Sequence, residues 1–244
     1  MNEEIWKNDL KNNITWPILK NGKFGPVYKY KQYAIKVLNP DKYELNMISY
    51  INSEISIQTA LIHDNIVRLY SHFIYDRNKY LVMEYMDKGD LFSIMKATPD
   101  KRFDEKTSLV YFDAMKCAID YCHSQGVIHR DVKIDNVLVD SQNNIKLADF
   151  GYAIRFKPGE KFTDLCGTLD YLCPEMIDDI PYDCRVDFWC LGVSLFEMTA
   201  GKQPFWDTTR LLTFRRIKNI NYKFPTYISE NIQNIVRCLL VRQE

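Results

Sequence analysis

Short apolar runs dominate the first third of the chain. Between Ile14 and Leu38 they predict three strands, and the runs Ile66–Tyr75 and Lys79–Tyr85 predict two more, with a polar turn between them. One stretch between the strands, from Leu45 to Leu61, has the periodicity of a helix. Its apolar face consists of Met47, Ile48, Ile51, Ile55 and Leu61. The first third is therefore predicted to be a sheet accompanied by one helix.

Helical periodicity replaces the strands after residue 90. Asp104 is a candidate N-cap for a long helix that ends before Gly126. From Arg185 to Ala200 nearly every position is apolar, which predicts a helix buried on all sides. Two more helices are predicted near Thr208–Ile217 and Ser229–Leu240. The whole pattern favours an α+β fold with a small sheet-based part and a larger helical part.

Two very short apolar runs in the middle of the chain, Val137–Val139 and Ile145–Leu147, predict a β-hairpin. A hairpin brings its two ends together, so the polar residues that flank it should converge at one point. These residues are Asp131, Lys133, Asn136 and Asp149. Two carboxylates, an amide and an ammonium at one point suit a Mg²⁺-bound nucleotide and a hydroxyl that accepts a phosphoryl group.

Composition excludes several classes of protein. The 244 residues are 46% hydrophobic and 26% charged, and 32 basic residues balance 32 acidic ones, so nothing global indicates binding to nucleic acid or to a membrane. The seven cysteines show no C-x-x-C spacing, and we expect reduced thiols in an intracellular protein without a zinc site. The acidic first residues lead into no apolar run, and no stretch reaches membrane-spanning length, so neither a secretory signal nor a membrane span is expected.

The flanks of the predicted hairpin also carry a family resemblance. The pattern H-R-D-x-K-x-x-N at residues 129–136, followed by D-F-G at 149–151, resembles the eukaryotic protein kinases. Its eight specified residues arise by chance with a frequency of roughly 10⁻¹⁰ per start position. The resemblance covers nearly the whole chain. It implies a bilobal fold with a small lobe at about 1–83, a hinge at 84–89 and a large lobe at 90–244, with ATP and Mg²⁺ as cofactors.

The resemblance implies a role for each polar residue around the hairpin. Asp131 orients the substrate hydroxyl and accepts its proton, and Lys133 neutralises the transferred phosphoryl group. Asn136 and Asp149 hold Mg²⁺. In kinases the backbone of the catalytic loop is held by the aspartate that corresponds to Asp187. All of these residues are present, which favours an active enzyme over a pseudokinase.

Further matches lie in the sheet. Lys36 in the run Tyr33–Leu38 corresponds to the kinase lysine that orients the α- and β-phosphates, and Glu54 to the helix glutamate that pairs with it. By themselves, an edge-strand lysine and a solvated glutamate would explain both residues. The other residues that the resemblance places at the nucleotide are Leu19, Gly22, Gly25, Val27, Ala34, Glu84 and Met86, the last two through their backbones.

The glycine-rich loop departs from the kinase pattern. Lys20 stands where G-x-G-x-x-G-x-V has its first glycine, and a plain hairpin turn would explain Gly22 and Gly25 equally well. Lys20 therefore motivates one alternative, a nucleotide-binding pseudokinase scaffold. A second departure is at the C-terminus, which ends before the arginine that pairs with Glu175 in kinases. The chain is then either a fragment or an abbreviated fold, and Glu175 needs another partner, with reduced stability as the expected consequence.

The stretch Thr163–Met176 is similar to the activation segment of Aurora-type mitotic kinases, as are Gly22–Gly25 and Glu54–Gln58. Asp164 replaces the threonine that Auroras phosphorylate, and Phe162 and Ser53 replace two of the arginines around it. We hypothesise that Asp164 pairs with the remaining Arg130 and orders the segment without a phosphate; an exposed loop acid is the equal alternative. Thr163 is a candidate phosphorylation site, and Thr168 is similar to the threonine that contacts the residue after the phosphorylated one.

Substrates and partners follow from the same resemblance. Asp90, Asp135 and Glu197 match positions where kinases with basic substrates place acids, so we expect Ser/Thr substrates with arginine two or three residues upstream. An inner-centromere-protein-like activator, a monomeric catalytic domain, and a role in chromosome segregation, spindle assembly and mitotic control are expected. The expected location is the nucleus and cytoplasm, including spindle or kinetochore. The second alternative is a signalling kinase of the cAMP-dependent type.

Overall fold

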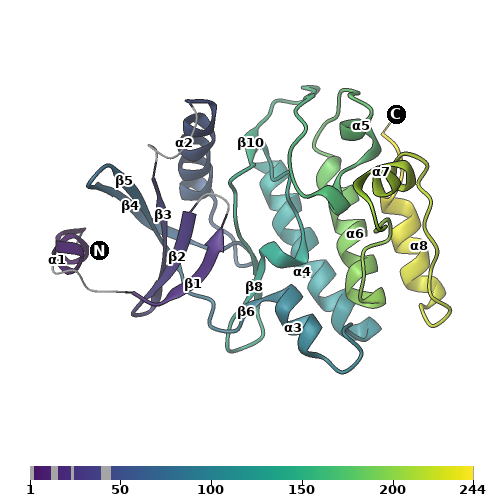
Figure 1. Ribbon diagram of the computed structural model, residues 1–244, viewed down its shortest axis with the longest axis horizontal. Helices are drawn as coiled ribbons and strands as arrows, with labels where there is room; N and C mark the ends of the chain where they lie inside the picture. The colour runs from purple at the N-terminus through teal and green to yellow at the C-terminus, as the bar shows by residue number, and fades with distance from the viewer. Residues whose placement is uncertain (1–2, 12–15, 23–24, 40–44, 244) are drawn as a thin grey trace.

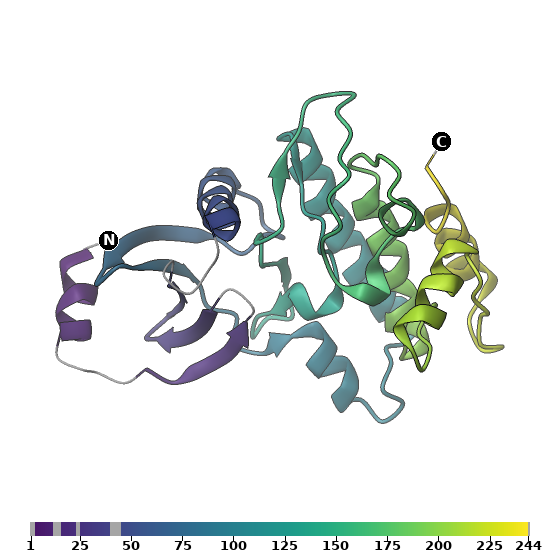
Figure 2. The same ribbon diagram turned by 45° about the horizontal axis from the view of Figure 1, so that its top comes forward.

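The computed structural model describes residues 3–11, 16–22, 25–39 and 45–243. An antiparallel sheet with helices on its two faces forms a small lobe, and a larger helical lobe follows (Figures 1 and 2). The C-terminal helices lie at the end of the large lobe that is farthest from the sheet (Figure 1). The predicted α+β class and the two-lobed architecture are therefore confirmed.

The five strands of the small lobe are antiparallel neighbours in the order β1-β2-β3-β5-β4. They span β1 (Ile18–Gly22), β2 (Gly25–Tyr30), β3 (Tyr33–Leu38), β4 (Leu69–Tyr75) and β5 (Asn78–Glu84). The predicted start of β4 at Ile66 is three residues early, because Ile66 forms only an isolated bridge to Leu147 of the large lobe. Gly25 has φ 122°, and a Cβ there would lie 2.0 Å from the carbonyl oxygen of Val37, so only glycine fits this position.

Helix α2 (Leu45–Ala60) packs on one face of this sheet (Figure 1). The apolar side chains between them are Leu38, Ile51, Ile55, Leu69 and Leu81. Met47 and Ile48, two residues of the predicted apolar face, belong to the helix, but the structure does not describe their side chains. The packing fixes the orientation of α2, and with it the position of Glu54.

A helix that the sequence analysis did not predict, α1 (Glu3–Lys11), lies on the outer side of the sheet (Figure 1). Trp6 is 4% exposed and stacks on Phe73 with ring centroids 5.6 Å apart. Phe73 stacks in turn on Tyr80, and Tyr30 donates a hydrogen bond to the Asp9 carboxylate. This aromatic layer covers the face of the sheet opposite α2 and so completes the hydrophobic core of the small lobe.

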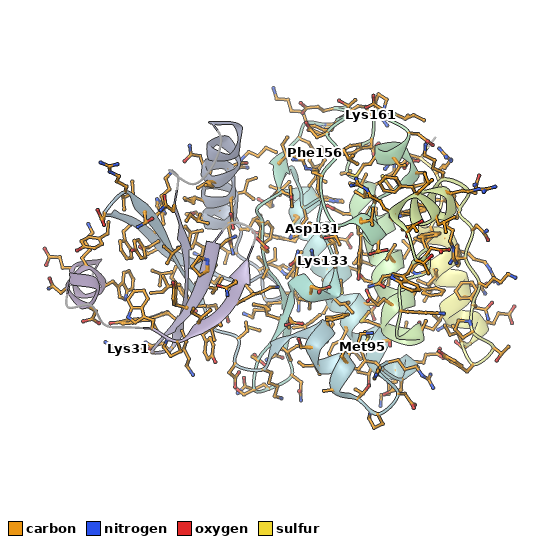
Figure 3. All side chains as sticks on the ribbon, in the orientation of Figure 1. Lys31, Met95, Asp131, Lys133, Phe156 and Lys161 are labelled. Atoms are coloured by element: carbon orange, nitrogen blue, oxygen red, sulfur yellow. The ribbon has the colours of Figure 1, made fainter. Side chains whose placement is uncertain are left out.

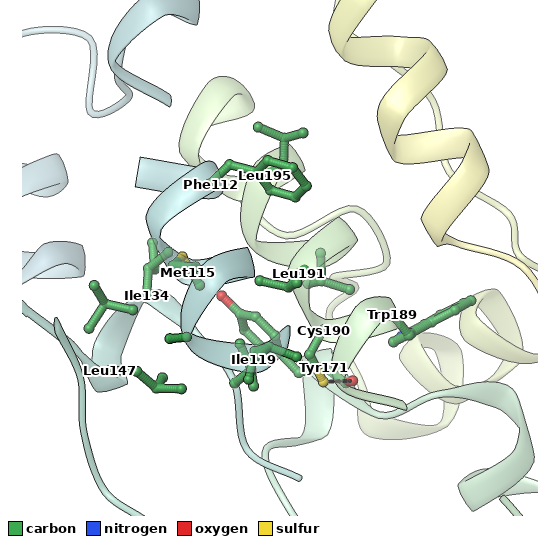
Figure 4. Close-up of a cluster of buried hydrophobic side chains, with 14 of the residues drawn as sticks. Phe112, Met115, Ile119, Ile134, Leu147, Tyr171, Trp189, Cys190, Leu191 and Leu195 are labelled. Carbon is green, nitrogen blue, oxygen red and sulfur yellow. Dashed lines mark hydrogen bonds between the residues drawn. The ribbon is translucent and has the colours of Figure 1, made fainter. Parts of the chain in front are cut away.

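The large lobe is built around α6 (Val186–Ala200), in which every residue except Phe188 and Ala200 is buried. The helices around it are α3 (Leu91–Ala97), α4 (Glu105–Ser124), α5 (Pro174–Ile177), α7 (Arg210–Lys218) and α8 (Glu230–Leu239). Asp104 caps α4 by accepting a hydrogen bond from the N–H of Thr107, as predicted. Figure 4 shows the core, where Leu191 and Leu195 of α6 lie near Phe112, Met115 and Ile119 of α4. The loops that precede and follow the predicted hairpin pack on this core.

Two small sheets lie where the lobes meet. The predicted hairpin is present as β8 (Val137–Val139) and β9 (Ile145–Leu147), with β6 (Gly89–Asp90) beside it. The strands β7 (Val127–Ile128) and β10 (Ile154–Arg155) form the other sheet. The N–H of Ala148 donates to the carbonyl of Asn136 over 2.8 Å, which closes the hairpin ends as predicted. Among the described residues, no helix is long and apolar enough to cross a membrane.

Candidate active site

The loop before the hairpin is fastened to the buried helix α6 through Asp187. The Asp187 carboxylate accepts the backbone N–H groups of His129 at 2.9 Å and Arg130 at 2.8 Å, and it contacts Nε2 of His123 at 2.8 Å. Burial would raise the pKa of Asp187, but His123 and His129 together outweigh it and lower this pKa. The contact expected for Asp187 is thus confirmed. It fixes a backbone in which Arg130 has φ 64°, an uncommon conformation for a residue with a side chain.

Asp131 and Asn136 face one another at the end of this loop. The side-chain Nδ2 of Asn136 donates to the carbonyl of Asp131 at 2.9 Å and to its Oδ2 at 3.0 Å. Since an amide has one nitrogen and one oxygen, this commits the nitrogen and leaves Oδ1 of Asn136 to accept or to ligate. Lys133 lies 3.0 Å from the same Oδ2 of Asp131. Figure 3 places Asp131 and Lys133 next to one another near the middle of the molecule.

Thr168 completes the surroundings of the Asp131 carboxylate. Its Oγ1 donates to Oδ1 of Asp131 over 2.7 Å and accepts from Lys133. The adjacent Gly167 has φ 101°, and a Cβ there would lie 2.7 Å from the carbonyl oxygen of Arg130. The segment around residue 168 therefore lies directly on the loop that carries Asp131, and Thr168 links the two.

Lys36 meets two carboxylates, one from each lobe. Its Nζ lies 2.6 Å from Oε1 of Glu54 in α2 and 3.0 Å from Oδ1 of Asp149, and the residue is 5% exposed. Burial disfavours the charge on Lys36, but these two carboxylates outweigh burial and raise its pKa above the usual value. Burial likewise opposes the charge on Asp149, yet Lys36 lowers the pKa of Asp149 to about 2. Both residues are therefore ionised at neutral pH.

A cavity of about 310 Å³ separates the lobes. Predicted residues that line it are Leu19, Gly25, Val27, Ala34, Lys36, Glu54, Glu84, Met86, Asn136 and Asp149. Gly22 ends β1 opposite Gly25, and residues 23–24 between them lie outside the described residues. An apolar cavity with a few converging polar groups at one end is the usual form of a small-molecule site. Ten of the residues that the resemblance places at a nucleotide or metal therefore line this one cavity.

The oxygen atoms at the inner end of the cavity fit a magnesium ion. Asp149 presents a carboxylate that is 40% exposed, and Asn136 presents the amide oxygen that its hydrogen bonds leave unused. No cluster of three or more His, Cys, Asp or Glu side chains exists among the described residues that could hold a metal alone. Mg²⁺ prefers one or two protein oxygens together with phosphate oxygens and water, so this donor set suits it.

The contact predicted between Asp164 and Arg130 is present. Nη1 of Arg130 lies 3.1 Å from Oδ2 of Asp164 and 3.3 Å from the hydroxyl of Tyr182, and Nε donates to the carbonyl of Tyr152 at 2.8 Å. The hydroxyl of Tyr182 donates to the carbonyl of Asp164 at 2.8 Å. Sequence analysis missed Tyr182, because no local signal links it to Arg130. Thr163, the candidate phosphorylation site, is exposed.

The three acids expected to face substrate arginines differ in exposure. Asp90 and Asp135 are partly exposed and line the cavity, and the carboxylate of Asp90 caps α3. Glu197 is 0% exposed, and its carboxylate accepts hydrogen bonds from Tyr171 and Gln203. Burial raises the pKa of Glu197 to about 7. The structure therefore brings two of the three acids to the surface and keeps the third inside.

Glu175 has a partner other than an arginine side chain. Its Oε1 accepts the backbone N–H of Gln243 at 2.8 Å, while the neighbouring Arg242 pairs with Asp178. The expectation that Glu175 uses another partner is confirmed. Its Oε2 is buried and accepts no hydrogen bond from the described residues, which is an unfavourable environment for a carboxylate.

Comparison with known proteins agrees with this geometry. Residues 17–244 match the family described as protein kinase domain. The Aurora kinase of Patiria pectinifera is 39% identical over 229 residues, which is 91% of this chain and 56% of that protein. Aurora kinase A-B of Xenopus laevis is 40% identical over 91% of this chain and 55% of its own length, and Aurora kinase C of Mus musculus is 37% identical over 91% and 82%. The chain thus spans little more than half the length of the first two.

Proposed function

Because the chain belongs to the protein kinase family, and within it to the Aurora kinases, we propose that it transfers the γ-phosphoryl group of ATP to serine and threonine hydroxyls of proteins. The supporting observation is that Lys36, Asn136 and Asp149 surround one end of a single cavity beside Asp131. The small lobe (about 1–83), hinge (84–89) and large lobe (90–244) are the proposed units, and the cavity between them is the proposed ATP site.

Each polar residue has a proposed task in this reaction. Asp131 orients the substrate hydroxyl and takes its proton as the oxygen attacks the γ-phosphorus and the bond to the β-phosphate oxygen breaks. Lys133, 3.0 Å from Asp131, compensates negative charge on the transferred group. Asn136 and Asp149 would hold Mg²⁺, which would neutralise the charge of the phosphates. Lys36, placed by Glu54, orients the α- and β-phosphates.

A transfer assay tests the proposal. We expect the purified chain to move radiolabelled phosphate from ATP to a peptide that contains Arg-x-Ser, and EDTA to abolish the transfer. A peptide with alanine in place of serine is the control. Binding of ATP without any transfer, with all peptides tested, would favour the pseudokinase scaffold instead.

The activation segment suggests how such an enzyme is regulated. Arg130 is 2% exposed, and a buried guanidinium requires an anion nearby. Asp164 supplies one at 3.1 Å, in the position where Aurora kinases carry the phosphothreonine. We therefore propose that Arg130, Asp164 and Tyr182 form a latch that orders the segment without a phosphate. Phosphorylation of Thr163 is a second proposed input.

Two further proposals concern the choice of substrate and the cellular role. Asp90 and Asp135 are proposed to bind the guanidinium of upstream arginines, and Glu197 to join them only when it exchanges Tyr171 or Gln203 for the substrate. A role in chromosome segregation, with a protein activator of the inner-centromere type, is proposed from the Aurora relatives. Activation of the kinase by such a segment would separate this role from that of a cAMP-dependent type of signalling kinase.

A further inference from the structure

Lys20 connects the sheet to the catalytic loop across the mouth of the cavity. It lies in β1, and its Nζ donates a hydrogen bond to the carbonyl oxygen of Asp135 over 3.3 Å. The two residues are 115 positions apart in the sequence. Both residues line the cavity between the lobes. Kinases have a glycine at this position of the loop, so the contact is a property of this chain. An ammonium group therefore reaches the proposed ATP site from β1.

The charge of Lys20 acts on the part of the cavity where phosphates would bind. Lys20, Asp135, Asn136 and Asp149 all line the same cavity, and Nζ of Lys20 lies 3.3 Å from the carbonyl oxygen of Asp135. A full positive charge at this place would attract a phosphate bound beside Asn136 and Asp149.

Among the described residues, two other lysines lie at this end of the cavity, and both are already held by carboxylates. Lys36 contacts Glu54 and Asp149, and Lys133 contacts Asp131. Lys20 is exposed, and its hydrogen bond to Asp135 ends on a neutral carbonyl oxygen at the long distance of 3.3 Å. Since bonds between an ammonium and an anionic oxygen are shorter and stronger than bonds to a neutral one, Lys20 gains by exchanging this carbonyl for a phosphate oxygen.

We propose that Lys20 is a third cationic ligand for the phosphates of the bound nucleotide, which it reaches by leaving the carbonyl of Asp135. The inference rests on the proposed ATP site but does not require that phosphoryl transfer take place. It also gives a reason for the lost glycine. The side chain of Lys20 carries a full charge, whereas a backbone N–H group offers a phosphate only a partial one.

Titration calorimetry with adenosine, ADP and ATP tests this role. In Lys20→Met, which keeps an unbranched side chain only one atom shorter and removes its charge, ADP and ATP should bind about three- to ten-fold more weakly, while adenosine binds as to wild type. Lys20→Arg should retain most of the affinity. Lys106→Met, at an exposed lysine of α4 outside the cavity, removes the same net charge and should change nothing. The loss should shrink in 0.5 M salt, because salt screens exposed charges.

Three results would overturn the inference. Equal weakening of adenosine and ATP would mean that Lys20 packs against the nucleoside. Tighter binding of ATP to Lys20→Met would mean that the lysine competes with the nucleotide for the cavity, and unchanged ATP binding would mean that it has no role there. A wild-type chain that binds neither adenosine nor ATP would instead refute the proposed ATP site itself, which these measurements distinguish from failure of the Lys20 proposal.

Discussion

The Nζ atom of Lys36 lies 3.0 Å from Oδ1 of Asp149, although the two residues are 113 positions apart and belong to different lobes. Lys36 is also 2.6 Å from Glu54, so one buried ammonium joins α2, the sheet and the catalytic end of the hairpin. Burying a charge without a partner is strongly unfavourable. The three residues are therefore expected to stabilise the arrangement of the lobes in which the cavity is complete.

Glu54→Gln tests this coupling. The substitution removes one of the two carboxylates beside the buried Lys36 and leaves Asp149. We therefore expect the free energy of unfolding in urea to fall by about 1–3 kcal/mol. The ratio kcat/KM for ATP should fall as well, because Lys36 is no longer held in place. Glu105→Gln, at an exposed position of α4, is the control. Equal stability of Glu54→Gln and this control would show that the pair is dispensable.

Asp164→Asn tests the latch on the activation segment. The amide keeps the shape of the side chain but removes the negative charge that faces the buried Arg130, 3.1 Å away. We expect unphosphorylated protein to lose about ten-fold in kcat/KM for the peptide, which corresponds to one charged hydrogen bond. Glu160→Gln removes an acid from the same segment without touching Arg130 and should retain activity. If both variants are equally active, Asp164 is only an exposed loop acid.

Tyr182→Phe separates the hydroxyl of the latch from its ring. Tyr182 is 0% exposed and pairs with Phe162 through backbone hydrogen bonds of 2.8 and 2.9 Å, which phenylalanine preserves. The hydroxyl bridges Arg130 and the carbonyl of Asp164. We therefore expect its removal to change activity by an amount that depends on whether the Asp164 carboxylate is present. The double variant Asp164→Asn, Tyr182→Phe should lose less than the sum of the single effects, by about 0.5 kcal/mol or more. Strict additivity would argue against a shared latch.

Glu197 predicts a pH dependence of stability. Its pKa is about 7 in the folded protein against 4.5 for a free carboxyl, so the folded state holds a proton that the unfolded state has lost between these values. Stability should therefore fall as pH rises from about 4.5 to about 7, by roughly 3 kcal/mol in total. Glu197→Gln should lack this fall, and the difference in unfolding free energy between variant and wild type should grow over the same range. A difference that does not change with pH would contradict this prediction.

Sequence was sufficient where chemistry and spacing are local. The hairpin and its polar flanks span residues 129–151, so their convergence follows from strand length alone. It was insufficient where a contact depends on distant residues. Trp6 of α1 packs on Phe73 and Tyr33 of the sheet, and these contacts cannot be inferred from residues 3–11 alone.

The sequence predicted that α6 is buried but did not show which polar side chains are enclosed with it. Glu197 occupies a helix position that resembles a substrate-binding acid, and only the packed structure shows it enclosed by Tyr171 and Gln203. Tyr182 was overlooked for the same reason, since its hydroxyl meets Arg130 across 52 positions of sequence. Long-range packing, rather than local propensity, decides both cases.

The most direct test of the account is the rate of phosphoryl transfer in Asp131→Asn. This variant removes the proposed proton acceptor but keeps one side-chain oxygen, which can still accept from Thr168, while Asn136 still donates to the backbone carbonyl of residue 131. We predict a rate at least about 100-fold below wild type, with ATP affinity within two-fold, while Asp113→Asn on the exposed side of α4 stays fully active. Transfer by Asp131→Asn at the wild-type rate would contradict the central claim that this carboxylate serves the reaction.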